Sequence, residues 1–469
     1  MNDAQLARLL TERNSWWANP EWERDDPDLR PLRATPFTYR PKPLRGITPG
    51  GLYLLLGPRR VGKTVELKRA VAAVIEAGAA PRQVTFLSCD GLRAADLRRA
   101  VGVARNLTRV VAGPRYWFID EVTSVPGWPA VIKDLRDGTD FRDACVVLTG
   151  SSSRDLQGAV DHLAGRRGDD AIGVERLLLP MPFRSFCHMT GHPENLPDVE
   201  PFRPRDVFDS GRDALEQLAP RWPELADQWE LYLAVGGYPQ AVRTFVERGA
   251  VAPAFRRDLW DVIRGEAFRS SRMTDAETLG LVARLAEGLG GPLNLSRITR
   301  DVGLSSHHLV EDRITSLTAA FLAFRCYRED AGRPNLGAQR KLYFVDPLVA
   351  TLAQERDRSY PVPDVPYLSE QQLALALARA VERERPGSFV AQTEVRFWRN
   401  PISGTEVDFV GPALAAGFES KYVDAGWRRE TQALIHRQRG GIVATRGALA
   451  LDDDAFAVPA GLLVWLLGG

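Results

Sequence analysis

The feature that most constrains this chain is an eight-residue motif near its N-terminus. The segment GPRRVGKT, residues 57–64, fits the pattern GxxxxGK[ST] and lies between an apolar run, GLYLLLG, and an amphipathic stretch from about Lys63 to Ala77. Such a loop needs a strand before it and a helix after it, because its backbone N–H groups and the helix start together hold a phosphate. We therefore expect a nucleotide to be bound by Gly57, Pro58, Arg59, Arg60, Val61, Gly62, Lys63 and Thr64.

Two adjacent acids, Asp120 and Glu121, end a second apolar run, YWFIDE. A carboxylate at such a strand end, together with the hydroxyl of Thr64, is suited to hold Mg²⁺, while Lys63 reaches the β- and γ-phosphates. The second carboxylate can orient and activate the attacking water. We assign Asp120 and Thr64 to the metal and Glu121 to the water, with a loop cap as the alternative for Glu121. The pattern predicts hydrolysis of ATP rather than binding alone.

A third apolar run, ACVVLTGSSS, brings two hydroxyl groups to the same sheet edge. Thr149 and Ser151 stand where a polar side chain can sense the γ-phosphate. The alternative is that these hydroxyls bond their own backbone in a turn. We include Thr149 among the expected nucleotide-binding residues.

The order of apolar runs and helical stretches predicts several domains. Five short runs between Leu52 and Leu179 alternate with helical stretches, which is typical of a parallel sheet in an α/β domain. After Pro180 the spacing becomes helical, then follows the helix, turn, helix and β-wing order of a winged helix. The last block mixes helices and strands and ends in GLLVWLLG, which we interpret as a strand. The predicted domains are a strap (1–48), an α/β core (49–212), a helical lid (213–273), a winged helix (274–355) and an α/β domain (356–469).

The motif order GPRRVGKT, FIDEV, LTGSS, LAGRR, LPMPFRSF and VGGYP resembles that of AAA+-type prokaryotic ATPases with a C-terminal winged helix and a restriction-endonuclease-like domain. The resemblance covers nearly the whole chain. It implies an adenine-specific AAA+ P-loop core, and a lid that approaches the base through a turn similar to Gly237-Tyr238-Pro239. It also implies that Arg166 acts on the γ-phosphate, in cis or from a neighbouring subunit of a homo-oligomer. Arg167 follows directly and is an alternative, as is a surface salt bridge for either arginine.

Two segments near the C-terminus, TEVDFV and GFESKY, carry Asp408, Glu419 and Lys421. Because strand side chains alternate, Glu419 and Lys421 fall on the same face. Two carboxylates and a lysine at neighbouring strand ends suit a metal-dependent phosphodiesterase. Asp408 and Glu419 would hold Mg²⁺, and Lys421 would polarise the water or stabilise the charge of the transition state.

This pattern resembles the PD-(D/E)xK nuclease signature, and the resemblance adds Glu370 as a further metal-binding acid. Glu394 and Glu406 are nearby alternatives for that acid. An ordinary cross-strand ion pair is the alternative for the whole cluster. Whether such a fold cleaves nucleic acid or only binds a partner stays open at this point.

The predicted winged helix carries eight basic residues against five acids between Gly291 and Val345. Its second helix begins SSHHLVEDR, so Glu311 and Asp312 would face DNA phosphates if that helix entered a groove. A packing module is therefore a second interpretation of this segment. His307 and His308 lack a third ligand at metal spacing, and the group of Cys187, His188 and His192 is interpreted as a loop thiol with exposed imidazoles.

Composition limits the partners of the chain. Lys and Arg number 61 and Asp and Glu number 60, so the formal charge of +1 argues against broad electrostatic capture of nucleic acid. No apolar run is long enough for a membrane span and no signal peptide is evident, so we expect a cytoplasmic protein without a membrane contact. The sequence predicts an ATP-hydrolysing protein coupled to a nuclease-like domain acting on DNA or RNA. The alternative is an ATP-gated interaction switch with an inactive nuclease-like scaffold.

Overall fold

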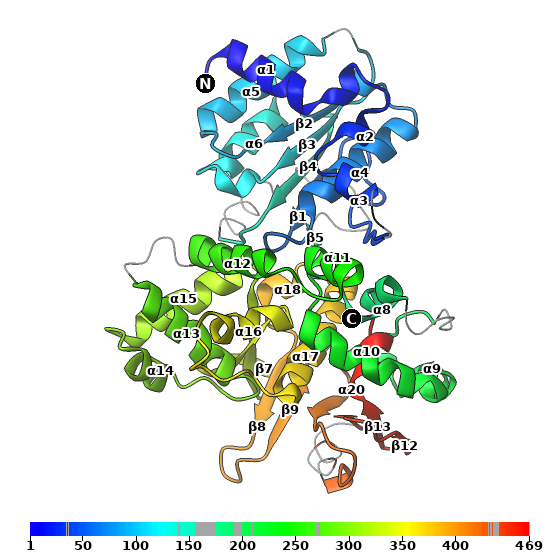
Figure 1. Cartoon of the computed structure of the whole chain (residues 1–469), viewed down its shortest axis with the longest axis vertical. Helices are drawn as coiled ribbons and strands as arrows, with labels where there is room; N and C mark the ends of the chain where they lie inside the picture. The colour runs from blue at the N-terminus through cyan, green and yellow to red at the C-terminus, as the bar shows by residue number, and fades with distance from the viewer. Residues whose placement is uncertain are drawn as a thin grey trace. The chain divides into compact units, whose positions relative to one another are not determined.

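The computed structural model divides the chain into two compact units, Met1–Leu179 and Pro180–Gly469 (Figure 1). The structure describes all residues except 34, 36, 110, 139–140, 155–174, 192–198, 209, 268–272, 430, 432–433, 435–439 and 469.

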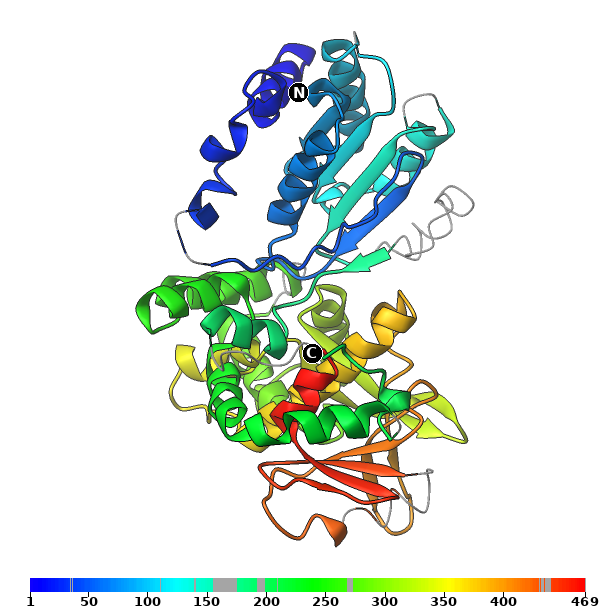
Figure 2. The same ribbon diagram turned by 90° about the vertical axis from the view of Figure 1, so that its right-hand side faces the viewer.

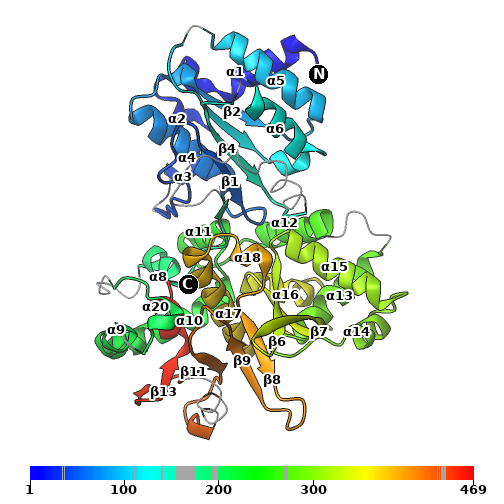
Figure 3. The ribbon, with the colours of Figure 1, turned by 180° about the vertical axis from the view of Figure 1, so that it is seen from behind.

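The first unit is built on a sheet of five described strands, all parallel, in the order β2-β3-β4-β1-β5. The strands are β1 (Leu52–Leu56), β2 (Val84–Ser88), β3 (Tyr116–Asp120), β4 (Cys145–Gly150) and β5 (Glu175–Leu177). Three helices flank them, α4 (Lys63–Glu76), α5 (Ala94–Leu107) and α6 (Trp128–Asp137). Figure 1 and Figure 3 show α5 and α6 on one side of the sheet and α4 on the other. The predicted five-stranded parallel sheet is confirmed.

The strand order places the carboxyl ends of β1, β4 and β3 next to one another. β4 is hydrogen-bonded to both β1 and β3, with Leu56 level with Gly150 and Ile119 level with Leu148. The carboxyl ends of these three strands therefore meet at one edge of the sheet, where ligands of open α/β sheets bind.

The N-terminal residues pair with the edge strand β2. They form the helices α1 (Asp3–Arg13), η1 (Ser15–Trp17), α2 (Trp22–Asp25) and α3 (Arg30–Arg33). The indole N–H groups of Trp16 and Trp17 both donate to the carbonyl of Val84, at 3.0 and 2.9 Å. The amide of Asn14 accepts from Phe86 N at 2.6 Å and donates to Phe86 O at 2.9 Å. These bonds satisfy part of the unpaired edge of β2.

The second unit begins with helices and ends in a mixed sheet. Its helices are α8 (Phe183–Thr190), α9 (Ser210–Leu218), α10 (Trp222–Val235), α11 (Pro239–Arg248), α12 (Pro253–Val262), α13 (Asp275–Glu287), α14 (Leu295–Val302), α15 (His307–Ala319), α16 (Pro347–Arg356), α17 (Val365–Glu384), α18 (Ser388–Ala391) and α20 (Ala460–Leu466). Within the described part of the chain, no helix has the length and apolarity needed to cross a membrane.

The mixed sheet contains eight described strands in the order β12-β13-β11-β10-β9-β8-β6-β7. They are β6 (Ala323–Asp330), β7 (Arg333–Phe344), β8 (Arg396–Arg399), β9 (Glu406–Val410), β10 (Gly417–Ser420), β11 (Gly441–Thr445), β12 (Ala450–Leu451) and β13 (Ala455–Pro459). The hairpin β6–β7 follows the helices α14 and α15, in the order predicted for a winged helix. However, β6 pairs in parallel with β8, so the hairpin belongs to the same sheet as the C-terminal strands (Figure 3).

The prediction of a final C-terminal strand was wrong. The segment GLLVWLLG forms the helix α20, which Figure 2 shows in red, leading out of the red strands. All seven residues of α20 are buried, and it packs against α17 and α10. A short apolar run that is buried on all sides lacks the periodicity that distinguishes a helix from a strand.

Candidate functional site

The loop between β1 and α4 requires glycine at two positions. Gly57 has a φ of +153°, and a Cβ atom there would lie 1.9 Å from the carbonyl oxygen of Leu178. Gly62 has a φ of +98° and is the N-cap of α4. Both conformations are readily available only to glycine. The predicted loop is thus a tight turn that ends in the N-terminus of a 14-residue helix, as a phosphate site requires.

Lys63 links this loop to the end of β3. Its side chain is 4% exposed, and Nζ donates to the carbonyl oxygens of Gly57 (2.9 Å) and Pro58 (3.0 Å). Nζ also lies 3.5 Å from Oε1 of Glu121. Burial lowers the pKa of Lys63, and the charges of Glu121 and Asp120 oppose that shift. The ammonium is therefore held inside the loop, at the position from which it can contact phosphate oxygens.

Asp120 accepts a hydrogen bond at each of its carboxylate oxygens. Thr64 Oγ1 donates to Oδ2 at 2.7 Å, and Thr149 Oγ1 donates to Oδ1 at 2.6 Å. Thr149 Oγ1 in turn accepts from the backbone N–H of Glu121 at 2.8 Å. Burial raises the pKa of Asp120, although both hydroxyl groups act in the opposite direction. The carboxylate of Asp120, at the end of β3, thus connects the start of α4 to the end of β4.

Glu121 follows β3 in the left-handed backbone region, with a φ of +52°. A non-glycine residue in this region is strained by about 1 to 3 kcal/mol and persists only where its surroundings hold it. Here the surroundings are polar, because Ser151 Oγ donates to Oε2 of Glu121 at 2.9 Å while Lys63 lies near Oε1. The structure therefore brings together Lys63, Thr64, Asp120, Glu121, Thr149 and Ser151 from the loop, β3 and β4.

The residues of this site fit Mg²⁺. The hydroxyl of Thr64 and a carboxylate oxygen of Asp120 are in direct contact, and both are hard oxygen donors of the kind Mg²⁺ prefers. Mg²⁺ commonly uses one or two protein oxygens and completes its shell with phosphates and water. If Mg²⁺ bound here with a nucleotide, Thr64 and Asp120 would be the residues that hold it.

Three other residues predicted for the nucleotide site are not part of this group: Pro239 belongs to the second unit, and the two arginines are not among the described residues. Arg166 and Arg167 fall within residues 155–174, which the structure does not describe. Pro239 is the first residue of α11 in the second unit, after a turn in which the N–H of Gly237 donates to Oδ2 of Asp346 at 2.7 Å. Its role toward the base stays a prediction.

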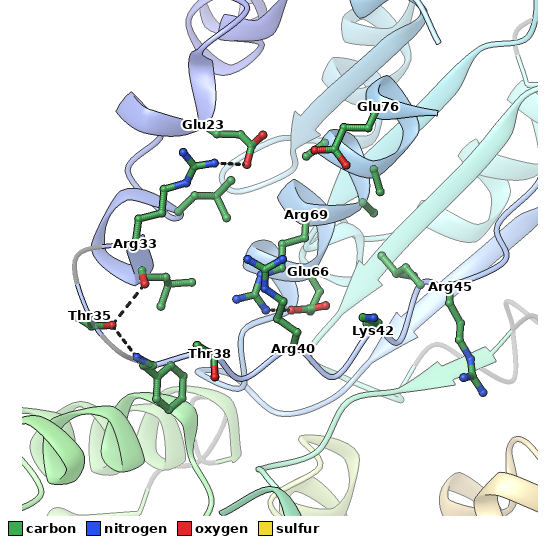
Figure 4. A pocket seen from close by; sticks show the side chains of 17 residues that line it. Glu23, Arg33, Thr35, Thr38, Arg40, Lys42, Arg45, Glu66, Arg69 and Glu76 are labelled. Atoms are coloured by element: carbon green, nitrogen blue, oxygen red, sulfur yellow. Dashed lines mark hydrogen bonds and ion pairs between the residues drawn. The ribbon is translucent and has the colours of Figure 1, made fainter. Parts of the chain in front are cut away.

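A cavity of about 420 Å³ lies between the N-terminal strap and α4 (Figure 4). Two ion pairs lie at its rim: Arg33 contacts Glu23 at 2.7 Å, and Arg69 contacts Glu66 at 2.5 Å. Burial raises the pKa of Glu66, which Arg69 opposes. No residue predicted to bind the nucleotide lines this cavity, so we assign it no ligand.

The predicted acidic cluster of the second unit is assembled by β9 and β10. Asp408 N donates to Oε2 of Glu419 at 3.2 Å, and Ser420 N donates to Oδ2 of Asp408 at 3.0 Å. Lys421 Nζ lies 2.9 Å from Oε1 of Glu419, as expected for residues on one face. Burial, with the nearby charge of Asp408, raises the pKa of Glu419 to about 8.

A second lysine, which the sequence analysis did not single out, lies in the middle of this cluster. Lys341 on β7 is 0% exposed, and its Nζ is 2.7 Å from Oδ1 of Asp408 and 2.7 Å from Oε1 of Glu406. It is also 3.4 Å from Oε1 of Glu370, which accepts from Tyr343 OH at 2.6 Å. Burial alone would lower the pKa of Lys341, but the surrounding carboxylates raise it well above its ordinary value.

Among the three candidate acids, the structure places Glu370 and Glu406 in the cluster. Glu394 instead pairs with Arg385 at 2.9 Å. Within the described part of the chain, no group of three or more His, Cys, Asp or Glu side chains is arranged to hold a metal ion.

One of the two acids near the start of the predicted second helix of the winged helix is engaged internally. Glu311 on α15 pairs with Arg325 at 3.2 Å and with Arg340 at 2.9 Å, both on the hairpin β6–β7. The rings of His307 and His308 lie 4.2 Å apart and are exposed. Cys187 is buried and His188 exposed, whereas His192 lies outside the described residues.

Two family models match parts of the chain. Residues 50–187 match a family described as an AAA domain, and residues 226–359 match a domain of unknown function, DUF8612. The second match runs from α10 to beyond α16 and so includes both the predicted winged helix and part of the predicted lid. An uncharacterised protein of Haemophilus influenzae is 22% identical over 303 residues, which are 62% of this chain and 66% of that protein, just under two thirds of its length.

Solved structures give weaker similarities. The Walker-type ATPase PABY2304 of Pyrococcus abyssi has a TM-score of 0.34 at 15% identity, over 72% of this chain and 95% of its own. The ORC1 protein of Aeropyrum pernix, solved in complex with DNA, has a TM-score of 0.30 at 16% identity, over 73% and 96%. TM-scores of this size do not establish a shared overall fold. The family match, the parallel sheet and the loop geometry together identify the first unit as an AAA-type P-loop ATPase domain.

Proposed function

We propose that this protein binds ATP with Mg²⁺ and hydrolyses it at the edge of the first sheet. The observation that carries the proposal is the contact of Glu121 with both Lys63 and Ser151, beside the Thr64, Asp120 and Thr149 network. These are the groups that phosphoryl transfer to water requires: a phosphate-binding lysine, oxygen donors for the metal and a carboxylate to orient the water.

Each residue has a distinct role in this proposal. Lys63 exchanges its bonds to the loop carbonyls for bonds to the β- and γ-phosphate oxygens, because a phosphate is the stronger acceptor for an ammonium. Glu121 accepts the proton of the attacking water at the oxygen that Ser151 orients. Thr149 connects the end of β4 to Asp120 and to the backbone of Glu121, so it holds the two acids in fixed positions relative to each other. Mg²⁺, when bound, neutralises charge that develops on the transferring phosphate.

The test compares binding with turnover. Glu121→Gln removes the base but keeps the size of the side chain, so ATP should still bind while turnover falls by about 100-fold or more. Lys63→Ala should weaken binding itself. Glu12→Gln, on the exposed face of α1, is a matched control that should leave both unchanged. Wild-type turnover in Glu121→Gln would refute the role of the base, and a wild-type protein that binds no ATP would refute the proposal.

For the second unit, we propose an ATP-gated interaction module rather than an active nuclease. Both carboxylate oxygens of Asp408 already have partners, Lys341 Nζ and Ser420 N, which favours a scaffold over a metal site. The nuclease alternative acting on DNA or RNA predicts cleavage with Mg²⁺ or Mn²⁺ that is lost in Asp408→Asn. A cleavage assay on single-stranded, duplex and branched DNA and RNA, with and without ATP, distinguishes the interaction module from the active nuclease. The scaffold predicts no cleavage, and an ATP-dependent change in hydrogen exchange in the second unit.

Two further parts of the proposal concern the γ-phosphate and the base. We propose that Arg166 or Arg167 contacts the γ-phosphate, within one chain or across a homo-oligomer, and that the turn ending in Pro239 approaches the adenine. Substituting each arginine by alanine and mixing the variant with Lys63→Ala protein distinguishes the two arrangements. Activity in the mixture above that of either variant alone supports a contact between subunits.

A further inference from the structure

The acidic cluster of the second unit contains its own cation. Lys341 is fully buried, and its Nζ lies within 2.7 Å of one oxygen of Asp408 and of one oxygen of Glu406, on β9. Glu370, on α17, completes the surroundings at 3.4 Å. Three carboxylates from two elements thus converge on one ammonium that comes from a third element, β7. This is the position between facing carboxylates where a divalent ion would have to lie to be shared by them.

The remaining carboxylate oxygen of Asp408 and both oxygens of Glu419 are also engaged. Oδ2 of Asp408 accepts from Ser420 N at 3.0 Å. Oε2 of Glu419 accepts from Asp408 N at 3.2 Å, and Oε1 of Glu419 pairs with Lys421. A metal ion bound by Asp408 and Glu419 would have to displace these groups. One of them is Lys341, which is a residue of strand β7 and cannot leave the site as a free ion could. The residues present therefore do not fit the metal site that the sequence pattern predicts.

We infer that Lys341 is the built-in cation of this cluster and that it excludes a divalent metal ion from Asp408. The ammonium supplies the positive charge without which the buried carboxylates would repel one another. The ion pairs of Lys341 also connect three elements, because this one side chain on β7 contacts residues of β9 and of α17. The cluster thus joins the hairpin of the predicted winged helix to the C-terminal strands, and it does so independently of any ion. This inference concerns the second unit alone and holds whether or not the first unit hydrolyses ATP.

The test measures Mn²⁺ binding to the nucleotide-free, full-length protein by electron paramagnetic resonance. Without nucleotide the P-loop contributes no phosphate ligands, so signal changes that depend on Asp408 report the cluster. The wild type should bind no Mn²⁺ that depends on Asp408. Lys341→Met removes the ammonium with little change in side-chain length. This variant should gain one Mn²⁺ site and bind Mn²⁺ at least about tenfold more tightly than the wild type, because buried carboxylates without a counter-charge favour binding of a cation. Lys341→Met combined with Asp408→Asn should lose that site again.

Two further variants serve as controls. Lys421→Met removes the half-exposed lysine of the same cluster and should not create an equivalent site, since Lys341 remains. If Lys341→Met does not fold, Lys341→Met with Glu370→Gln removes one positive and one negative charge together and allows the same measurement. Stoichiometric Mn²⁺ binding by the wild type that Asp408→Asn abolishes would overturn the inference. A folded Lys341 variant that binds Mn²⁺ no better than the wild type would overturn it as well.

Discussion

Ser151 donates a hydrogen bond of 2.9 Å to Oε2 of Glu121, across the ends of the neighbouring strands β4 and β3. The other carboxylate oxygen lies 3.5 Å from Nζ of Lys63. Glu121 is thus held from both sides, in a left-handed backbone conformation that glycine would adopt more readily. A carboxylate fixed in this way is pre-organised for a water that approaches the phosphate held by the loop.

The first prediction concerns the hydroxyl of Ser151. Ser151→Ala should lower kcat by about tenfold with little change in the Kd of ATP, because it removes the group that orients the base without touching the phosphate contacts. Ser151→Thr keeps the hydroxyl and should restore most of the rate. Steady-state ATP turnover and equilibrium ATP binding measure the two effects. Equal rates for the alanine variant and the wild type would show that Ser151 does not position Glu121.

The second prediction concerns Thr149, which donates to Asp120 at 2.6 Å and accepts from Glu121 N at 2.8 Å. Thr149→Val keeps the shape but leaves both partners without this hydroxyl. We expect the free energy of unfolding of the first unit to fall by about 1 to 3 kcal/mol, the cost of unsatisfied buried polar groups. Thr149→Ser should be closer to the wild type in both stability and turnover. Urea unfolding of the two variants checks this, and a valine variant of wild-type stability would contradict it.

The nucleotide site was predictable because its signals are local. The loop and Glu121 directly follow apolar strands, Asp120 and Thr149 lie near the ends of such strands, and parallel strands end at one edge of a sheet. The hydrogen bond between Ser151 and Glu121 was not predictable, because only the register of β3 and β4 brings the two side chains together. The helix α20 was mistaken for a strand because its burial on every side leaves no periodicity in the sequence.

Lys341 shows why part of the second site could not be found from sequence. Its partners Glu370 and Asp408 are 29 and 67 residues away, and only the joining of β6 to β8 brings them together. The usable signal was composition. The chain has only six lysines, and Lys63, Lys68 and Lys341 are 4%, 3% and 0% exposed, so half of the lysines are buried and ion-paired. At these three positions a compact ammonium suits the contacts better than a planar guanidinium would.

The third prediction concerns Lys68, which anchors the N-terminal strap to α4. Its Nζ lies 3.1 Å from Oδ2 of the buried Asp26, and 5.0, 5.9 and 4.3 Å from the ring centres of Trp16, Trp22 and Phe86. Lys68→Met should destabilise the first unit by about 3 to 5 kcal/mol, because Asp26 would remain buried without its cation. Thermal or urea unfolding measures the loss.

A double variant distinguishes the charge from the packing. Lys68→Met with Asp26→Asn removes both charges, and the asparagine can still accept from the backbone N–H groups of Asp28 and Leu29. The pair should therefore recover a large part of the stability. Lys133→Met, at a partly exposed position of α6, is the matched control and should change stability little. If the double variant were no more stable than Lys68→Met, the ion pair would not be the source of the loss.

The last prediction concerns the pH dependence of the second unit. Asp346 is fully buried, and its carboxylate accepts from Gly237 N at 2.7 Å and from Leu348 N at 2.9 Å. Burial raises its pKa from 3.8 to about 7, even though these two N–H groups and the charges of Arg379 and Arg256 act in the opposite direction. Between these two pH values the folded carboxyl holds a proton that the unfolded one has lost. The contribution of Asp346 to stability is therefore fully present below about pH 4 and is lost as the pH rises through about 7.

Asp346→Asn removes this titration while keeping one carbonyl oxygen for the turn at Gly237. The variant should be less stable than the wild type at low pH, because the second backbone acceptor is lost. The difference should narrow as the pH rises toward 8, where the wild type carries a buried charge. Asp357→Asn is the matched control on the exposed end of α16, because hydrogen bonds from Ser359 lower the pKa of Asp357. Its stability curve should run parallel to that of the wild type above about pH 5, well above both pKa values of that carboxyl. Urea unfolding across this range provides the measurement, and a constant difference between Asp346→Asn and the wild type would show that Asp346 does not titrate there.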